Sequence, residues 1–285
     1  MDNFSKPRTI QTENIRLYLT HLREQERAGQ TIQKYARDLE ALAAFLPDGQ
    51  LSKNALLSWK EHLASRYAAA SVNTMLASLN GFLAFMGWHD LKVKPLKIQR
   101  QIFCAAEKEL TRAEYLRLVQ AAKAKGNERL SLILQTICST GIRVSELKWI
   151  TAEAVRTGRA QVACKGKHRT IFLPPKLRKL LRAYLGEQKR TEGPVFVTKT
   201  EKPIDRSNIW RDMKALCESA GVEPGKVFPH NLRHLFARTY YSLEKDLSRL
   251  ADILGHSNIS TTRIYTMESG DIHEKQLERM GLVTT

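Results

Sequence analysis

The sequence lacks any apolar run that approaches the roughly 18 residues of a membrane-spanning helix. Its polar N-terminus, MDNFSKPRTIQTENI, has no apolar core of the kind found in signal peptides. These absences predict an intracellular, cytoplasmic protein. The four cysteines are scattered and form no CxxC pair, which argues against a disulfide framework or a thiolate zinc site and favours reduced, mostly buried thiols. Internal repeats and low-complexity segments are also absent.

Acidic residues are too few to balance the basic ones. The chain of 285 residues is long enough for two domains with separate cores, and its formal net charge is +17. Residues 1–100 hold 14 basic and 9 acidic side chains, and the other 32 basic and 20 acidic side chains follow. Both halves therefore favour a polyanion, and nucleic acid is the commonest one inside cells. A merely soluble basic protein, or one that lies on an anionic membrane surface, is the alternative on charge alone.

The first part of the chain has a helical pattern from about residue 12 to residue 88. Apolar residues recur there at spacings of three and four, as is typical of helices with one buried face. Thr12, Thr31 and Ser52 precede such runs, as residues that begin a helix do. The segment therefore predicts a domain built of helices.

A basic segment follows these helices. In HDLKVKPLKIQRQIFCAAEKEL, Pro95 and several lysines interrupt the helical period. Such a segment could span two domains, lie along phosphates or be a solvated connection, which is the default for a run of charge. The predicted organisation is a helical domain over 1–92, a basic linker over 93–107 and a second domain over 108–285.

The second domain is predicted to combine helices with one β-hairpin. Thr111 and Glu114 have the spacing of a capping box before YLRLVQAA. In AQVACKGKHRTIFLPP the period changes to that of strands on both sides of the polar tip KGKH. Helices resume with KLRKLLRAYL and, after a short strand-like PVFV, with RSNIWRDMKALCESAG. The expected fold class is mainly α with a small β-hairpin in the C-terminal domain.

Two places before residue 170 hold side chains that suit a phosphate. In STGIRVSEL, Arg143 follows Gly141 at a helix start, where unpaired N–H groups and an arginine fork both attract an anion. An ordinary ion pair between Arg143 and Glu146 is the alternative. Lys165 stands at the hairpin tip CKGKHR, where it could protonate a leaving oxygen or neutralise charge. Lys167, His168 and Arg169 compete with it for that role, and a solvated lysine is the plain alternative.

The motif PHNLRH presents His230 and Arg233 on one face of a helix, a proton-transfer group beside a fixed cation. His230 and His234 also have the spacing of two zinc ligands. Because Asn231 stands where the glutamate of that motif would be, and no further ligand is evident, we do not expect a metal. A histidine satisfied within the core remains the alternative.

The stretch LGHSNISTTRIYT carries His256 and Tyr265. Gly255 can end the preceding helix in a left-handed conformation, and Asn258 or Ser260 can cap a helix that carries Tyr265. A tyrosine in a helix usually packs with its hydroxyl at the rim of the core. Its other use is covalent, because a phenolate can attack phosphorus and form a phosphotyrosine.

In their order and spacing, TGIRVSEL, KGK at a hairpin, HNLRH and LGHSNISTTRIYT resemble the motifs of the tyrosine recombinases, also called the phage integrase family. The resemblance extends over about residues 108–270 and is strongest to two-domain Xer recombinases and small transposon-borne relatives. It implies a helical core-type DNA-binding domain followed by a catalytic tyrosine recombinase domain. The implied activity is site-specific DNA strand breakage and rejoining through a 3′-phosphotyrosyl intermediate.

The resemblance also implies roles for single residues. It makes Tyr265 the nucleophile, Arg143 and Arg233 the clamp on the scissile phosphate, and Glu146 a support of the site. The remaining catalytic roles fall to Lys165, which protonates the leaving 5′ oxygen, to the proton-handling His230, and to His256, a donor to the phosphate. Hairpin lengths vary, so Lys167 competes with Lys165. RHLFAR departs from the family's usual RHTFAT at Leu235 and Arg238, which leaves local packing and a DNA contact open.

No cofactor is expected, because two guanidiniums and imidazole donors supply what a metal ion would otherwise give to the phosphate. No ATP is needed either, since the phosphotyrosyl bond conserves the energy of the DNA backbone. The nearest rival is a type IB topoisomerase, which shares the covalent chemistry. A DNA-binding protein that keeps the fold without catalysis is a second alternative.

The tail DIHEKQLERMGLVTT can form a short helix with a small apolar stripe. It could dock on its own domain, whereas the resemblance implies a helix given to a neighbouring protomer. We therefore expect a homo-tetramer on double-stranded DNA with specific sites, associated with the nucleoid, and with a possible accessory or partner recombinase. The sequence leaves the biological task open among chromosome-dimer resolution, integration and excision, and cointegrate resolution.

Overall fold

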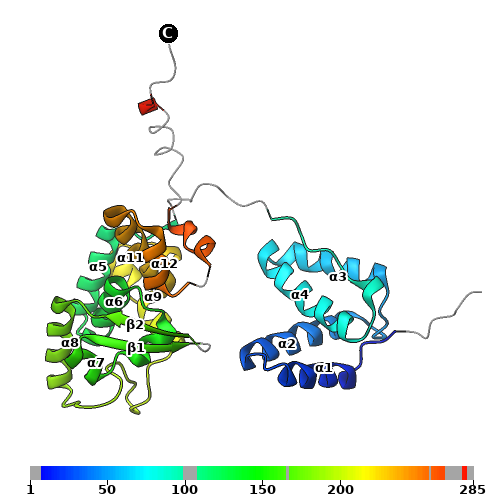
Figure 1. Ribbon diagram of the computed structural model, residues 1–285, viewed down its shortest axis with the longest axis horizontal. Coiled ribbons are helices and arrows are strands. Elements are labelled where there is room, and N and C mark those ends of the chain that lie inside the picture. Colours follow the sequence, from blue (N-terminus) through cyan, green and yellow to red (C-terminus); the bar gives the residue numbers. More distant parts are fainter. Residues whose placement is uncertain (1–7, 99–107, 165–166, 257, 267–277, 281–285) are drawn as a thin grey trace, which may run out of the picture. The chain divides into compact units, whose positions relative to one another are not determined.

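The structure is a computed structural model that describes residues 8–98, 108–164, 167–256, 258–266 and 278–280. The chain divides into two compact units, residues 1–100 and 101–285 (Figure 1). Helices dominate both, and the one named sheet of the described residues is a two-stranded antiparallel hairpin. The predicted fold class, mainly α with a small hairpin, is confirmed. No helix in the described ranges is long and apolar enough to cross a membrane.

The first unit is a bundle of four helices. They are α1 (Thr12–Glu24), α2 (Gly29–Phe45), α3 (Lys53–Arg66) and α4 (Ala69–Phe85), followed by the short 3-10 helix η1 (His89–Leu91). Their apolar faces enclose one core in which Trp59 and Phe82 are among the largest fully buried side chains. The buried carboxylate of Asp38 in this core accepts hydrogen bonds from Lys34 and from the hydroxyl of Ser78.

Only one of the three predicted helix starts is a true cap. Ser52 accepts a hydrogen bond from the N–H of Ala55, whereas Thr12 and Thr31 lie inside their helices. Helix α1 is preceded by Gln11, and α2 already begins at Gly29. The N–H of Thr31 donates to the carbonyl of Ala28, so Thr31 belongs to the first turn.

The first residues of the segment predicted to be a linker pack against the first unit. The side chain of Val93 is buried, and its backbone N–H and C=O both pair with the side chain of Asn80. Asn73 forms the same two bonds with Leu96. Residues 93–96 are therefore held by α4.

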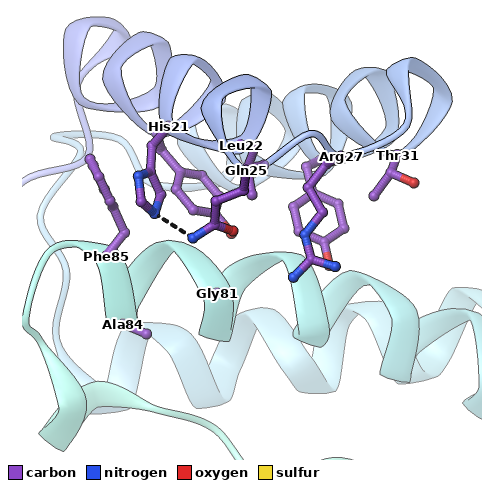
Figure 2. A pocket seen from close by; sticks show the side chains of 10 residues that line it. His21, Leu22, Gln25, Arg27, Thr31, Gly81, Ala84 and Phe85 are labelled. Carbon is purple, nitrogen blue, oxygen red and sulfur yellow. Dashed lines mark hydrogen bonds between the residues drawn. The ribbon is translucent and has the colours of Figure 1, made fainter.

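A pocket of about 420 Å³ opens between α1 and α4 of this unit. Figure 2 shows His21 of α1 and Gln25, the residue that follows α1, facing Phe85 and Gly81 of α4, with the His21 Nε2 and Gln25 Nε2 atoms 2.9 Å apart. The pocket belongs to the first unit alone and contains none of the motif residues singled out above.

The second unit is built around α6 (Glu128–Thr140), which is buried on most of its surface. Around it lie α5 (Arg112–Ala124), α8 (Pro175–Glu187), α9 (Arg206–Lys214) and α11 (Pro229–Glu244) (Figure 1). The predicted capping box at the start of α5 is present. The helix expected over 206–221 is divided into α9 and α10 (Cys217–Ala220).

The predicted hairpin is present as β1 (Arg159–Cys164) and β2 (Lys167–Phe172), with Val162 paired to Arg169. It follows η3 (Val144–Trp149) and α7 (Ala152–Thr157). The strand expected at PVFV is reduced to isolated bridges that involve Pro194 and Pro203. Because proline has no N–H to donate, a longer ladder cannot form there.

The end of the described chain folds against α11. It comprises α12 (Leu247–Leu254), η5 (Ile259–Thr261) and η6 (Arg263–Thr266), whereas the short η4 (Pro224–Lys226) precedes α11. A small apolar cluster of Ala237, Leu250, Leu254 and Tyr265 joins α11, α12 and η6. Most of the tail expected to form a coupling helix lies outside the described residues.

Candidate active site

Arg143 enters the site because α6 ends just before it. Gly141 closes α6 with a φ of 64°, and Arg143 then becomes the residue that precedes η3. Glu146, which is only 3% exposed, accepts one hydrogen bond from the backbone N–H of Arg143 at 2.9 Å and another from Nη1 at 3.0 Å. The ion pair between the two side chains, weighed above as the alternative, is therefore present, and it orients the guanidinium of Arg143.

Glu146 also binds a second arginine. Nη2 of Arg169, on strand β2, lies 2.5 Å from Oε2 of Glu146. Burial alone would raise the pKa of Glu146, but the hydrogen bond from the N–H of Arg143 and the charge of Arg169 outweigh it, so the pKa is lowered. One buried carboxylate thus holds two cations in place.

Helix α11 carries Arg233 into the interior, where it is 2% exposed. Its guanidinium donates to the carbonyls of Gly141 and Leu254, and Nη2 lies 3.1 Å from Nε2 of His256. Burial and the nearby Arg143 lower the pKa of Arg233 to about 10, against an opposing effect of Tyr265. Because this value is far above neutrality, Arg233 stays charged.

His230 and His234 lie one turn apart on α11. Their rings meet edge to face, with centroids 4.5 Å apart. Burial, together with Arg233 and Arg143, lowers the pKa of His230, while burial, His230 and Arg233 lower that of His234 to about 4. Within the described ranges no group of three His, Cys, Asp or Glu side chains could hold a metal ion.

His256 follows the C-terminal end of α12. Gly255 has a φ of 63° and ends α12 in the left-handed conformation, as predicted. Nδ1 of His256 lies 2.8 Å from the hydroxyl of Thr262. Burial and the cations of Arg233, Arg143 and Arg169 lower the pKa of His256 to about 4, with a smaller contribution from His230.

Tyr265 does not lie in the α-helix that its flanking sequence predicts. Asn258 does cap a helix, through the N–H of Ser260, but that helix is the 3-10 turn η5, and Tyr265 belongs to a second one, η6. The N–H groups of Thr262 and Tyr265 both donate to carbonyls three residues earlier. These tight turns carry Thr262, whose buried hydroxyl lies beside Nδ1 of His256.

The phenol of Tyr265 is 4% exposed. Its ring meets His234 edge to face at 4.6 Å between centroids and stacks on His256 at 6.0 Å. The imidazole of His234 therefore lies between the rings of Tyr265 and His230. The tyrosine is held inside the cluster of cations and imidazoles and not on the outer surface.

The structure thus brings together most of the residues singled out from the sequence: Arg143, Glu146, His230, Arg233, His256 and Tyr265. Lys165 lies outside the described residues, and Lys167 is described only as the first residue of β2. Sequence reasoning gave no structural role to Arg169 or Thr262. The partners of Arg169 are distant in the sequence, and Thr262 meets His256 across a turn, so residue spacing could not have predicted either contact.

The two departures from the family motif are also accounted for. Leu235 is half-buried and packs against the core of the second unit. Arg238 forms an ion pair with Glu109, at the start of the same unit. Both residues therefore have structural partners within their own unit.

Fixed guanidiniums, neutral imidazoles and a phenol are suited to one kind of chemistry. Guanidiniums bind and neutralise the oxygens of a phosphate, imidazoles transfer protons, and a phenol can act as the nucleophile. The fold and the site together define a tyrosine recombinase. Residues 108–270 match the model of the phage integrase family, and residues 15–89 match that of the phage integrase N-terminal SAM-like domain. The chain belongs to the phage integrase family.

Curated relatives support this assignment, and a solved structure shares the fold. The chain is 31% identical over 245 residues to tyrosine recombinase XerA of Thermococcus kodakarensis, an alignment that covers 82% of this chain and 84% of the relative. It is 32% identical to tyrosine recombinase XerD of Xanthomonas campestris, with 86% and 84% covered. The fold matches a lambda integrase tetramer bound to a Holliday junction with a TM-score of 0.74 at 18% identity, covering 92% of this chain and 78% of that one.

Proposed function

We propose that this recombinase breaks and rejoins DNA strands by transferring them to and from Tyr265. The Oη atom of Tyr265 attacks the phosphorus of one phosphodiester, a new O–P bond forms and the bond to the 5′ oxygen breaks. The 5′ oxygen leaves with a proton as a hydroxyl group, and the strand stays attached to Tyr265 by a 3′-phosphotyrosine. A 5′ hydroxyl from another strand reverses the step and releases the tyrosine.

The observation that carries this proposal is the position of the phenol. Tyr265 is held in ring contact with His256, and His256 lies 3.1 Å from the buried Arg233. Arg143 reaches the same place, because its Nη2 donates to the carbonyl of Gly255 at 3.2 Å. Attack on phosphorus drives negative charge onto the non-bridging oxygens, which Arg143 and Arg233 then stabilise. Glu146 supports them by orienting Arg143.

Proton transfer falls to the remaining side chains. His230 has a lowered pKa and is therefore neutral near pH 7, and we assign it a proton-handling role beside Arg233. His256 is assigned as a donor to the phosphate. Lys165 is assigned as the acid that protonates the leaving 5′ oxygen, with Lys167 as the other candidate on the hairpin.

The substrate is double-stranded DNA that carries specific sites. The excess of positive charge in both halves of the chain suits a phosphate backbone. Lambda integrase, which has the same fold, is a tetramer on a Holliday junction, and we assign the same stoichiometry here. In this assignment the tail after Thr266 couples neighbouring protomers, and its removal should weaken cooperative DNA binding and strand exchange.

The test uses DNA that the protein itself selects. Duplexes bound by the full chain are recovered from a random pool, and the enriched site is built into a nicked suicide substrate that cannot be religated. We expect a covalent adduct that withstands denaturation and that Tyr265→Phe abolishes. Tyr241→Phe is the matched control, because Tyr241 packs against the same apolar cluster and also loses only a hydroxyl. Its adduct should form normally.

Other results would replace the proposal. An adduct that survives in Tyr265→Phe would assign the nucleophile to another residue. Relaxation of supercoiled DNA without exchange between two sites would identify a type IB topoisomerase. Specific binding without any adduct in the unaltered protein would identify a DNA-binding protein that has lost catalysis.

A further inference from the structure

The C-terminal end of α12 is bound by three arginines from different parts of the second unit: Arg143 just before η3, Arg169 on β2 and Arg233 on α11. The carbonyl of Ile253 accepts from Arg169 at 2.6 Å, that of Leu254 from Arg233 at 2.6 Å, and that of Gly255 from Arg143 at 3.2 Å. The last carbonyls of a helix have no partner within it, and they carry the negative end of its dipole. These arginines therefore satisfy the end of the helix that leads directly to His256.

Two of these arginines have a second task under the proposed function. Arg143 and Arg233 are assigned to the scissile phosphate, which is a far stronger ligand for a guanidinium than a carbonyl is. When a phosphate engages them, their hold on Leu254 and Gly255 weakens. Arg169 is not assigned to the phosphate, so its bond to the carbonyl of Ile253 persists when the phosphate binds.

Both the guanidinium and the aliphatic part of Arg169 contact buried parts of the fold. Its Nη2 lies 2.5 Å from the buried carboxylate of Glu146, and its side chain is 14% exposed. It also packs flat against Gly255, since a Cβ added there would lie 2.8 Å from Cδ of Arg169 and 3.2 Å from its Nε and Nη1. Only glycine allows this approach together with the left-handed backbone at residue 255.

We propose that Arg169 is a positioning residue for strand cleavage: it ties the end of α12 to Glu146, so that His256 keeps its place when Arg143 and Arg233 bind the phosphate. This inference rests on the proposed function, because it assigns a role within the same site. It predicts that Arg169 affects the rate of cleavage at saturating DNA far more than it affects the affinity for DNA.

The chain offers a matched control for the test. The side chain of Arg178 also packs against a glycine in the left-handed conformation, Gly158. It donates to two carbonyls at the end of a helix, those of Val155 and Arg156, at 3.1 and 2.5 Å. It therefore has the same structural task at the end of α7, away from the cluster around Tyr265. Arg178→Gln should lower stability about as much as Arg169→Gln and leave cleavage unchanged.

The experiment measures single-turnover adduct formation on the suicide substrate at saturating DNA, with DNA affinity and thermal unfolding measured alongside. A displacement of catalytic groups by about 1 Å can cost about 100-fold in rate, and we expect a loss of that order for Arg169→Gln with DNA affinity changed less than about threefold. Arg169→Lys keeps the charge but not the forked bonds, so it should restore part of the folding stability and little of the rate.

A second readout follows the imidazole itself. Arg169 is one of the cations that lower the pKa of His256, together with Arg233 and Arg143 and, more weakly, His230. Arg169→Gln should therefore raise the pKa of His256 in an NMR titration of the full chain, whereas Arg178→Gln should not.

The outcomes separate this inference from the proposal on which it rests. Equal rate losses in Arg169→Gln and Arg178→Gln, or an unchanged rate in folded Arg169→Gln, would overturn the positioning role. A lack of any adduct in the unaltered protein would instead overturn the proposed function.

Discussion

The Nδ1 atom of His256 lies 2.8 Å from the hydroxyl oxygen of Thr262, which is fully buried. On the other side of the ring, Nη2 of Arg233 lies 3.1 Å from Nε2. A guanidinium has only donors, so Nε2 must accept and Nδ1 must carry the proton that Thr262 accepts. These neighbours select one neutral tautomer, and a donor role for His256 towards a phosphate requires a second proton on the ring.

Replacement of Thr262 by valine tests this relationship. The substitution keeps the shape of the side chain but leaves the N–H of His256 without its partner. An unsatisfied buried donor costs about 1–3 kcal/mol, so the free energy of unfolding should fall by about that amount. If 1.4 kcal/mol of it is also lost from the transition state, cleavage slows about tenfold. Thr262→Ser keeps the hydroxyl and should retain most of the free energy of unfolding and most of the cleavage rate. Equal losses in Thr262→Val and Thr262→Ser would contradict the tautomer assignment.

The stability of the protein should depend on pH through its histidines. The pKa values of His234 and His256 are about 4 in the folded chain, against an ordinary 6.5. Between these values the unfolded chain binds more protons than the folded one, so stability should fall as pH drops from about 6.5 to about 4. Thermal unfolding across this range checks the slope, and His234→Phe should make it shallower. If His234→Phe left the pH dependence of stability unchanged, His234 would not contribute to it.

The ion pair of Arg238 and Glu109 should contribute little to stability and nothing to the chemistry. The side chain of Arg238 is partly exposed, and such pairs typically contribute about 0.2–1 kcal/mol. Arg238→Thr should therefore lower the free energy of unfolding by less than about 1 kcal/mol and leave adduct formation unchanged. A double-mutant cycle with Glu109→Gln isolates the coupling. A large loss of DNA affinity in Arg238→Thr alone would show instead that this arginine contacts DNA.

Gly255→Ala should impair both folding and cleavage. The new Cβ would lie 2.8 Å from Cδ of Arg169, and the φ of 63° is costly for any residue with a side chain. Strain of this kind costs on the order of 1–3 kcal/mol. Gly158→Ala is the matched control, because its Cβ would meet Arg178 in the same way. We expect similar losses of thermal stability in both variants, and slower adduct formation only in Gly255→Ala.

Local patterns predicted much of the architecture. The capping box of Thr111 and Glu114, the cap at Ser52, the hairpin and the left-handed Gly255 all depend on residues within a few positions of one another. Such features follow from backbone geometry and hydrogen-bonding capacity alone, so periodicity and spacing suffice to find them.

The connections that assemble the site could not be predicted in this way. Arg169 reaches Glu146 and Ile253 across 23 and 84 positions of sequence. The 3-10 turn around Tyr265 accompanies a contact between the buried hydroxyl of Thr262 and His256, whereas the flanking sequence by itself favours a longer helix. Contacts between distant segments are decided by packing, and a single sequence carries no spacing rule for them.

The end of α12 also bears on how like charges can gather before a substrate arrives. Three guanidiniums converge there on three carbonyl dipoles, and Glu146 pairs with two of them, those of Arg143 and Arg169. Backbone dipoles relieve mutual repulsion without neutralising it, so the net positive charge remains available to an incoming anion. Folding has already gathered these side chains, so under the proposed function the phosphate takes the place of the carbonyls of Leu254 and Gly255 beside Arg233 and Arg143. Under the proposed function, the end of α12 thus gathers positive charge at the place where the scissile phosphate binds.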